Sequence, residues 1–291
     1  MSSNKEVSKI SKEDEAKIAM LLGSKEAPRS GGSNDRLPQL KTNSKRKDPQ
    51  GRKIEEGAFF LSGVDEPLYT DTVTIRVLSQ MFQWIHYDPE INKVANKTLL
   101  IPNFRHEARD MKGTIRCGKP TSKELKELTK AKQKQYEDIK CFRQLRVLVS
   151  YEGVDADGNK GTVENEPAIL LLKGANFNPF EDEFMKGIPR GANLYDYEAK
   201  VTAEELENGS VTYYVMHFAP QLDSALPLDQ KTFDTMTKLA EMIVAENTMI
   251  DASYNKSLRD KSSDDDAIEA VVTGNTLDDL ESDLEDDTEA A

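Results

Sequence analysis

The chain is poor in the features of secreted and membrane proteins. Its 291 residues include only two cysteines, Cys117 and Cys141, and these are not in a CxxC spacing. No run approaches the roughly eighteen consecutive apolar residues of a transmembrane helix. The first twenty residues also lack the apolar stretch of a secretion signal. We therefore expect a reduced, soluble, cytoplasmic protein.

The motifs of the large enzyme classes are missing as well. The sequence contains no GxxxxGK[ST] phosphate loop, no GxGxxG, no HExxH and no GxSxG. Acidic pairs such as Asp155 and Asp157 are explained as well by a turn as by catalytic chemistry. We expect that the protein is not an enzyme.

Metal ligands are few and widely spaced. His86, His106, Cys117 and Cys141 offer the nitrogen and sulfur atoms that zinc accepts. Successive members are 20, 11 and 24 residues apart, so none of the short paired spacings of zinc motifs is present. We predict no metal site and no other cofactor.

Charge is what the sequence has in excess, and its sign changes along the chain. Residues 262–291 carry twelve Asp or Glu and no Lys or Arg, which is most of the net charge of −13. Residues 37–151 have 22 basic and 14 acidic side chains, whereas residues 152–261 have 10 and 20. The overall pI near 4.9 therefore conceals a basic middle.

Composition divides the chain into three parts. Residues 1–36 end in a Ser-, Gly- and Pro-rich stretch and are predicted to be a flexible N-terminal arm. Residues 37–261 are predicted to be a single-stranded nucleic-acid-binding domain that ends in a long helix at 228–258. Residues 262–291 are predicted to be a disordered acidic tail, because neighbouring carboxylates repel and only a few leucines interrupt them.

The periodicity of the middle part favours strands. Val73, Ile75 and Val77 alternate with polar neighbours and predict a strand at 71–87, and 141–151 has the clearest strand pattern. Further strands are predicted at 58–62, 97–102, 167–173, 194–202 and 210–220, and a helix at 123–139. Five to eight strands with few helices predict a mainly β (α+β) fold, a small antiparallel barrel or sandwich with peripheral helices and disordered termini.

Basic and aromatic residues alternate in this middle part. Single strands are bound by cations along the backbone and by rings under the bases, each stacked base contributing roughly 1–3 kcal/mol. A core position is the alternative for rings such as Trp84. The candidate nucleic-acid-binding residues are Arg76, Trp84, Tyr87, Lys97, Phe104, Arg105, Arg109, Arg116, Lys119, Arg143 and Arg146.

Three stretches, LPQLKTNSKRKD, FQWIHYDPEINKVANKTLL and TIRCGKPTSKE, precede the acidic end. In this plan, residues 37–291 resemble the single-stranded DNA-binding proteins of tailed phages. The resemblance implies an OB-like antiparallel barrel as the core. It also implies a protein that coats and protects single-stranded DNA in phage replication, recombination and repair, in the host cytoplasm. It also implies an acidic tail that competes with DNA and recruits replication and recombination proteins. The tail residues assigned to partner binding are Asp278, Asp279, Glu281, Asp283, Glu285, Asp286 and Asp287.

Two departures from that family plan stand out. The helix at 228–258 is not required in a minimal OB barrel. The tail ends in DDTEAA, without the terminal phenylalanine that many cellular relatives use as an anchor. Contact with partners through the very end of the tail is therefore less strongly indicated than its acidity suggests.

Other functions fit the same charges. The basic middle suits a virion or scaffold protein that meets an acidic partner without nucleic acid, and the tail suits a transcription accessory factor that binds polymerase. A purely solubilising tail is a further alternative. Homo-oligomers are compatible with the sequence, which does not separate DNA from RNA.

Overall fold

The computed structural model describes residues 37–48, 51–88, 93–106, 108–113, 115, 122–209 and 211–262. The predicted N-terminal arm therefore lies outside the described residues. So does the predicted tail, apart from Ser262.

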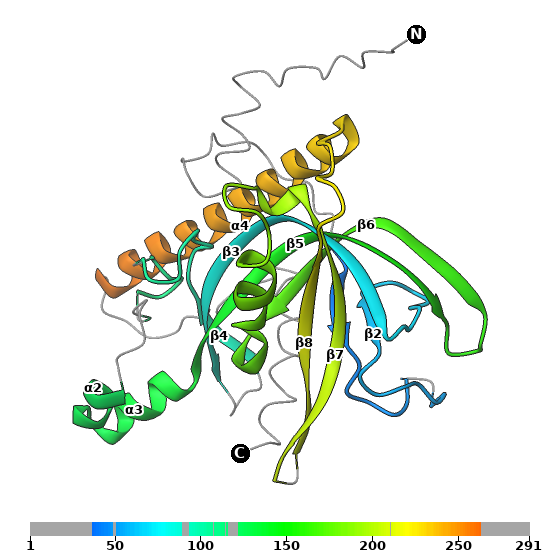
Figure 1. The fold of residues 1–291 in the computed structure, drawn as a ribbon. Helices are drawn as coiled ribbons and strands as arrows, with labels where there is room; N and C mark the ends of the chain where they lie inside the picture. The colour runs from blue at the N-terminus through cyan, green and yellow to red at the C-terminus, as the bar shows by residue number, and fades with distance from the viewer. Residues whose placement is uncertain are drawn as a thin grey trace.

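Eight strands and one long helix account for most of the described chain (Figure 1). The strands are β1 (Gln39–Thr42), β2 (Phe59–Ser62), β3 (Thr72–Asp88), β4 (Lys93–Lys97), β5 (Ile139–Val154), β6 (Lys160–Leu172), β7 (Glu198–Asn208) and β8 (Val211–Gln221). The α-helices are α2 (Ser122–Glu127), α3 (Lys130–Glu137) and α4 (Gln230–Ser262). Short helical turns are η1 (Gly174–Asn176), η2 (Phe180–Met185) and η3 (Leu194–Asp196).

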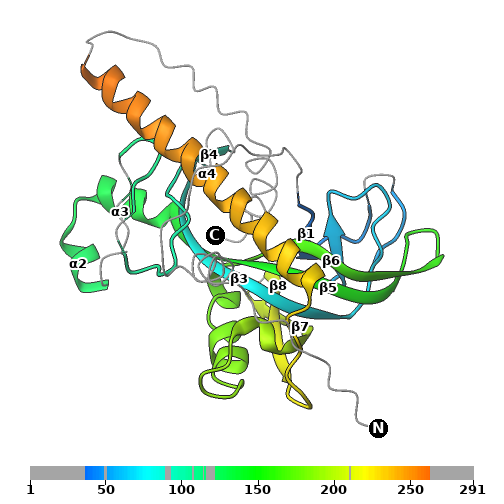
Figure 2. The same ribbon diagram turned by 90° about the horizontal axis from the view of Figure 1, so that it is seen from above.

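All eight strands belong to one sheet. Its order is β2-β1-β6-β5-β3-β7-β8, and β4 pairs with β3 off this path. The pair β1–β6 is parallel and the other pairs are antiparallel. The sheet curls strongly into a half-barrel (Figures 1 and 2). The mainly β fold is thus confirmed, but the sheet is mixed where the sequence predicted an antiparallel one.

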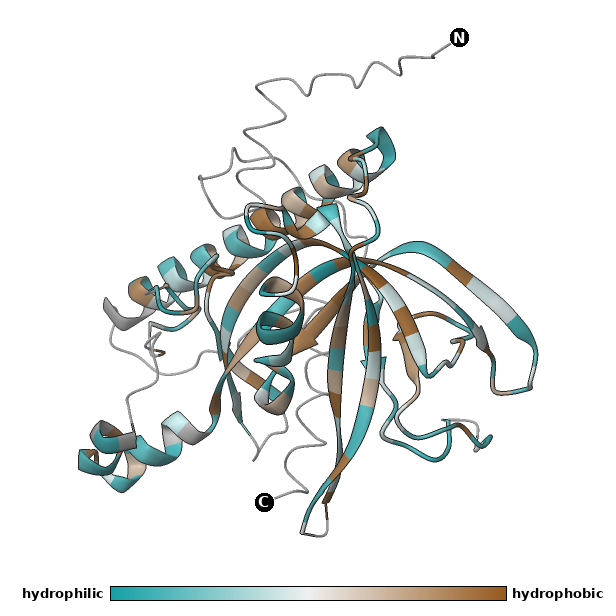
Figure 3. Cartoon of the chain, viewed as in Figure 1, coloured by the Kyte–Doolittle hydropathy of each residue, from teal (hydrophilic) through white to brown (hydrophobic). Residues whose placement is uncertain are grey.

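The long central strands β3 and β5 are covered on both faces. On one face Val77, Leu145 and Val147 join a core that extends to β6, β7, β8 and η2. On the other face Leu78 and Leu148 pack with α4. Apolar residues accordingly line these strands in Figure 3. Polar side chains in the middle of β5, such as Arg143 and Arg146, are therefore buried on whichever face they lie.

Helix α4 crosses the curled sheet (Figure 2). Asp229 begins it, because its carboxylate accepts a 2.7 Å hydrogen bond from the backbone N–H of Thr232. The helical period then buries one stripe of apolar side chains. This stripe consists of Met236, Leu239, Ala240, Ile243 and Ile250.

Two predicted elements differ from the structure. The strand predicted at 97–102 is not continuous, because β4 ends at Lys97 and only isolated bridges follow, at Thr98 and Ile101. The helix predicted at 123–139 is two helices, and Thr129 caps the second with its side chain. Side-chain capping of this kind favours a new helix start over continuation.

Candidate nucleic-acid interface

Six of the eleven predicted nucleic-acid-binding residues lie inside the protein, with 1–7% of their surface exposed. The sequence pattern predicts these side chains along an open groove; in the structure five of them lie on β3 and β5, which are covered on both faces, and Lys97 lies on β4. A strand of nucleic acid does not reach these side chains in this conformation. The six are Arg76, Trp84, Tyr87, Lys97, Arg143 and Arg146.

The other five divide into two groups. Arg105 and Arg109 are exposed, and Phe104 is half-buried. Arg116 and Lys119 lie outside the described residues, as do the seven tail residues assigned to partner binding.

Three of the buried cations share the face of the sheet that α4 covers. The Arg76 guanidinium donates to the carbonyls of Tyr195 (2.7 Å) and Pro227 (2.9 Å). Burial lowers the pKa of Arg76, although nearby carboxylates such as Asp229 oppose the shift. Arg76 thus joins β3 to the segment that leads into α4.

The other two cations, Lys97 and Arg146, meet Glu246 of α4. Its carboxylate lies 3.0 Å from Lys97 Nζ and 3.9 Å from Arg146 Nη2. Gln83 also donates to it, at 3.1 Å. Burial opposes ionisation of Glu246, yet the charges of Lys97 and Arg146 outweigh it and lower the pKa of this carboxyl.

Arg143 lies on the opposite face of β5, among aromatic rings. Its guanidinium carbon is 4.8 Å from the ring centroid of Phe177, 5.3 Å from Phe82 and 5.5 Å from Phe180. It also bonds the Glu181 carboxylate at 2.8 Å. These cation–π and ionic contacts attach the segment around η1 and η2 to the sheet.

Trp84 has a supporting position. Its ring is buried, and its Nε1–H donates to the carbonyl of Phe104 at 3.1 Å. The Phe104 ring contacts Phe177 edge to face, with centroids 5.7 Å apart, and the Arg105 guanidinium lies 5.5 Å from the Phe104 ring. Phe104 and Phe177 are both half-buried. Phe104 and Phe177 thus form a pair of partly accessible rings beside the exposed Arg105. The hydrogen bond from Trp84 holds the backbone of Phe104 in place.

Positive charge concentrates in the stretch of chain that contains Phe104. Residues 93–140, which we call the basic end, hold thirteen Lys or Arg and six Asp or Glu. Figures 1 and 2 both show α2 and α3 on the side of the sheet toward which the C-terminal end of α4 points. The exposed cations described here are Lys93, Arg105, Arg109, Lys112, Lys123, Lys126, Lys130, Lys132 and Lys134.

Some members of this interface were not among the predicted binding residues. The lysines of α2 and α3 were interpreted only as part of an exposed helix, although KAKQK at 130–134 is a local basic signal. Phe177 had no such signal. Its partner Phe104 lies 73 residues earlier in the chain, and no local pattern predicts that contact.

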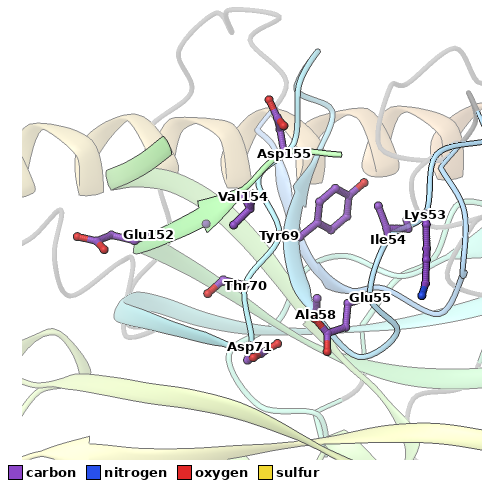
Figure 4. A pocket seen from close by; sticks show the side chains of 11 residues that line it. Lys53, Ile54, Glu55, Ala58, Tyr69, Thr70, Asp71, Glu152, Val154 and Asp155 are labelled. Atoms are coloured by element: carbon purple, nitrogen blue, oxygen red, sulfur yellow. The ribbon is translucent and has the colours of Figure 1, made fainter. Parts of the chain in front are cut away.

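A separate hollow of about 330 Å³ lies between the β1–β2 connection and the β5–β6 hairpin (Figure 4). Its charged lining consists of Lys53 against four carboxylates. These belong to Glu55, Asp71, Glu152 and Asp155. Such a lining repels phosphate, so this hollow is not part of the candidate interface.

Within the described ranges, no three His, Cys, Asp or Glu side chains gather so as to hold a metal ion. None of the helices in the described part of the chain has the length and apolar character needed to cross a membrane.

Comparison with known proteins yields no match to a family model, to a curated protein sequence or to a solved structure.

Proposed function

We propose that the protein binds single-stranded DNA, and that it coats and protects such strands in phage replication, recombination and repair. The curled sheet serves as an OB-like scaffold, and the basic end serves as the binding face. The observation that carries this proposal is the half-buried ring pair Phe104 and Phe177, with the exposed guanidinium of Arg105 5.5 Å from the Phe104 ring.

The mechanism is stoichiometric. Lysine and arginine side chains of the basic end neutralise phosphates along the strand, which releases counterions and makes affinity fall with salt. The half-buried rings stack on bases with little sequence preference, for roughly 1–3 kcal/mol per base. Duplex DNA keeps its bases stacked inside and gains only the phosphate contacts.

The acidic tail competes for the same surface. It follows α4, whose last turns contact the loop of the basic end through Arg109 and Asp251 at 3.2 Å. Disorder, which the sequence predicts for the tail, would give its 29 residues beyond α4 an average span of about 30 Å, enough to reach that loop. Bound DNA displaces it and leaves its carboxylates, from Asp278 to Asp287, available to replication and recombination proteins.

Titration with a labelled oligothymidine and with a duplex of equal length tests this function. We expect tight, salt-dependent binding of the single strand and weaker binding of the duplex, measured by fluorescence anisotropy. Equal affinity for both would contradict the base-stacking role of the rings. Failure to bind either nucleic acid would favour the virion or scaffold alternative.

The ring pair has its own test. Phe104→Leu with Phe177→Leu keeps apolar volume but removes the flat faces, so affinity for the single strand should fall about tenfold or more. The matched control is Phe60→Leu with Tyr69→Leu, another ring pair, with centroids 5.5 Å apart and outside the basic end. A loss of the same size in the control would remove the special role of Phe104 and Phe177.

A further inference from the structure

The two halves of α4 are attached to the sheet in different ways. The first half buries Met236, Leu239, Ala240 and Ile243, each with 6% or less of its surface exposed. We call residues 246–262 the distal half. Among its described side chains Ile250 is the only buried apolar one, while Met249 and Leu258 are 55% and 47% exposed. The distal half therefore gains little from apolar burial.

Polar contacts hold the distal half instead. Glu246 pairs with Lys97 and Arg146, and Asp251 pairs with Arg109. Asn247 adds two hydrogen bonds to the backbone of Leu100, at 2.8 and 3.1 Å. Two carboxylates of one helix thus occupy three cations that the sequence predicted as nucleic-acid contacts.

The buried part of this arrangement leaves donors of Arg146 unused. Lys97 and Arg146 both face the carboxylate of Glu246. Arg146 is 2% exposed, and its Nε and Nη1 atoms have no hydrogen-bond partner among the described residues. The hydroxyl of Ser79, the residue paired with Arg146 across β3 and β5, is also buried without a partner in the described chain. Buried donors without acceptors are unfavourable, and a phosphate offers an arginine several oxygens at once.

We propose that the distal half of α4 covers a second phosphate-binding surface, formed by Lys97, Arg109 and Arg146, and that a single strand bound at the basic end displaces it. This inference rests on the proposed function. Glu246 and Asp251 occupy the positions that phosphates take in the complex. The first half of α4 keeps its apolar contacts, so the domain stays folded while the distal half moves away.

Hydrogen exchange on the unmodified full chain, with and without oligothymidine, tests the displacement directly. We expect amides of the distal half to exchange several times faster in the complex, and amides of the first half to keep their rates. Equal or stronger protection of the distal half in the complex would overturn the inference.

Charge removal gives a second test. Asp251→Asn and Glu246→Gln each remove one competing carboxylate and should tighten binding of oligothymidine several-fold at low salt. Glu241→Gln is the matched control, because it removes the same charge from an exposed position of the same helix. Asp251 is partly exposed, so its variant keeps the test valid if the Glu246 variant is unstable.

The outcomes separate the two proposals. A wild-type chain that binds no single strand at any salt concentration removes the proposed function and this inference together. A second outcome is that the chain binds single strands, both variants have the affinity of Glu241→Gln, and hydrogen exchange in α4 is unchanged by DNA. This outcome supports the proposed function and excludes only the displacement of the distal half.

Discussion

At the scale of single residues, burial decides what a charged side chain can do. Arg143 stands in the sequence beside Phe142 and within a strand pattern, which suggested a stacking and phosphate site. In the fold its guanidinium is enclosed by Phe82, Phe177 and Phe180 and bonded to Glu181. The attraction between cation and ring is the same, but both partners belong to the protein.

Arg143→Ala should therefore lower the free energy of unfolding by about 3 kcal/mol, since it empties a packed site and leaves Glu181 unpaired. Urea unfolding measures the change. Arg105→Ala, at an exposed position, should stay within about 0.5 kcal/mol of wild type. If Arg143→Ala were as stable as wild type but bound DNA more weakly, Arg143 would have to contact the nucleic acid itself.

At the scale of elements, η1 and η2 protect an edge of the sheet. The side chain of Asn176 bonds the backbone of Tyr214 and Met216, and Glu183 accepts from the N–H of Phe218. These side chains form hydrogen bonds with backbone N–H and C=O groups of β8 that could otherwise pair with another strand. Glu183 also approaches His217 Nδ1 at 2.8 Å, and Glu204 approaches the Nε2 atom at 3.0 Å.

This cluster predicts a pH effect on stability. The bond to Glu183 raises the pKa of His217 above 6.5, against a smaller effect of burial, and Glu204 adds to the increase. A raised pKa means that the stabilisation is complete below about pH 6.5 and is lost as pH rises through the higher value. Because the ring is substantially exposed, we expect a loss of at most about 1 kcal/mol.

Unfolding free energies measured from about pH 6 to pH 9 should fall for wild type and change less for His217→Gln. His106→Gln, at an exposed position, is the control and should follow wild type. Parallel curves for wild type and His217→Gln would show that the contacts with Glu183 and Glu204 do not stabilise the protonated ring.

At the scale of the whole molecule, opposite charges lie in separate parts of the chain. The basic end carries an excess of seven positive charges, while residues 152–261 have an excess of ten negative ones. The twelve carboxylates of 262–291 then follow α4, in which Asp251 pairs with Arg109 of the basic end. Attraction between the tail and the basic end is screened by salt, so its effect on binding depends on ionic strength.

A chain that ends at Lys261 should bind oligothymidine more tightly than the full chain at low salt, with the difference shrinking as salt increases. Anisotropy titrations over a salt series measure this. The control is a full-length chain with Asn and Gln in place of the twelve tail carboxylates, which separates charge from length. Affinities that are identical for all three chains at every salt concentration would exclude the competition.

Much of the fold could be predicted from local periodicity. Alternation located β3, β5 and the β7–β8 hairpin, and the helical repeat of Met236, Leu239 and Ile243 located α4. The break at Thr129 was missed because Leu125, Leu128 and Tyr136 are compatible with one continuous helix.

The binding face was harder to predict than the fold. Alternation assigns two faces to a strand but does not say that both are covered, so Arg146 on β5 was expected in a groove and lies beneath α4. The contact between Phe104 and Phe177 depends on the path of two loops. Tertiary structure alone brings such residues together.

The parallel pairing of β1 with β6 has a consequence for biosynthesis. Gln39 lies opposite Ile169, so a ribosome adds 130 residues after Gln39 before its partner is in the chain. At about 5–20 residues per second this takes roughly 7 to 26 seconds. Until β6 is made, Leu40, Phe59 and Leu61 of the nascent chain lack the strand that covers them. The part of this domain that is translated first is therefore among the last to be protected from aggregation.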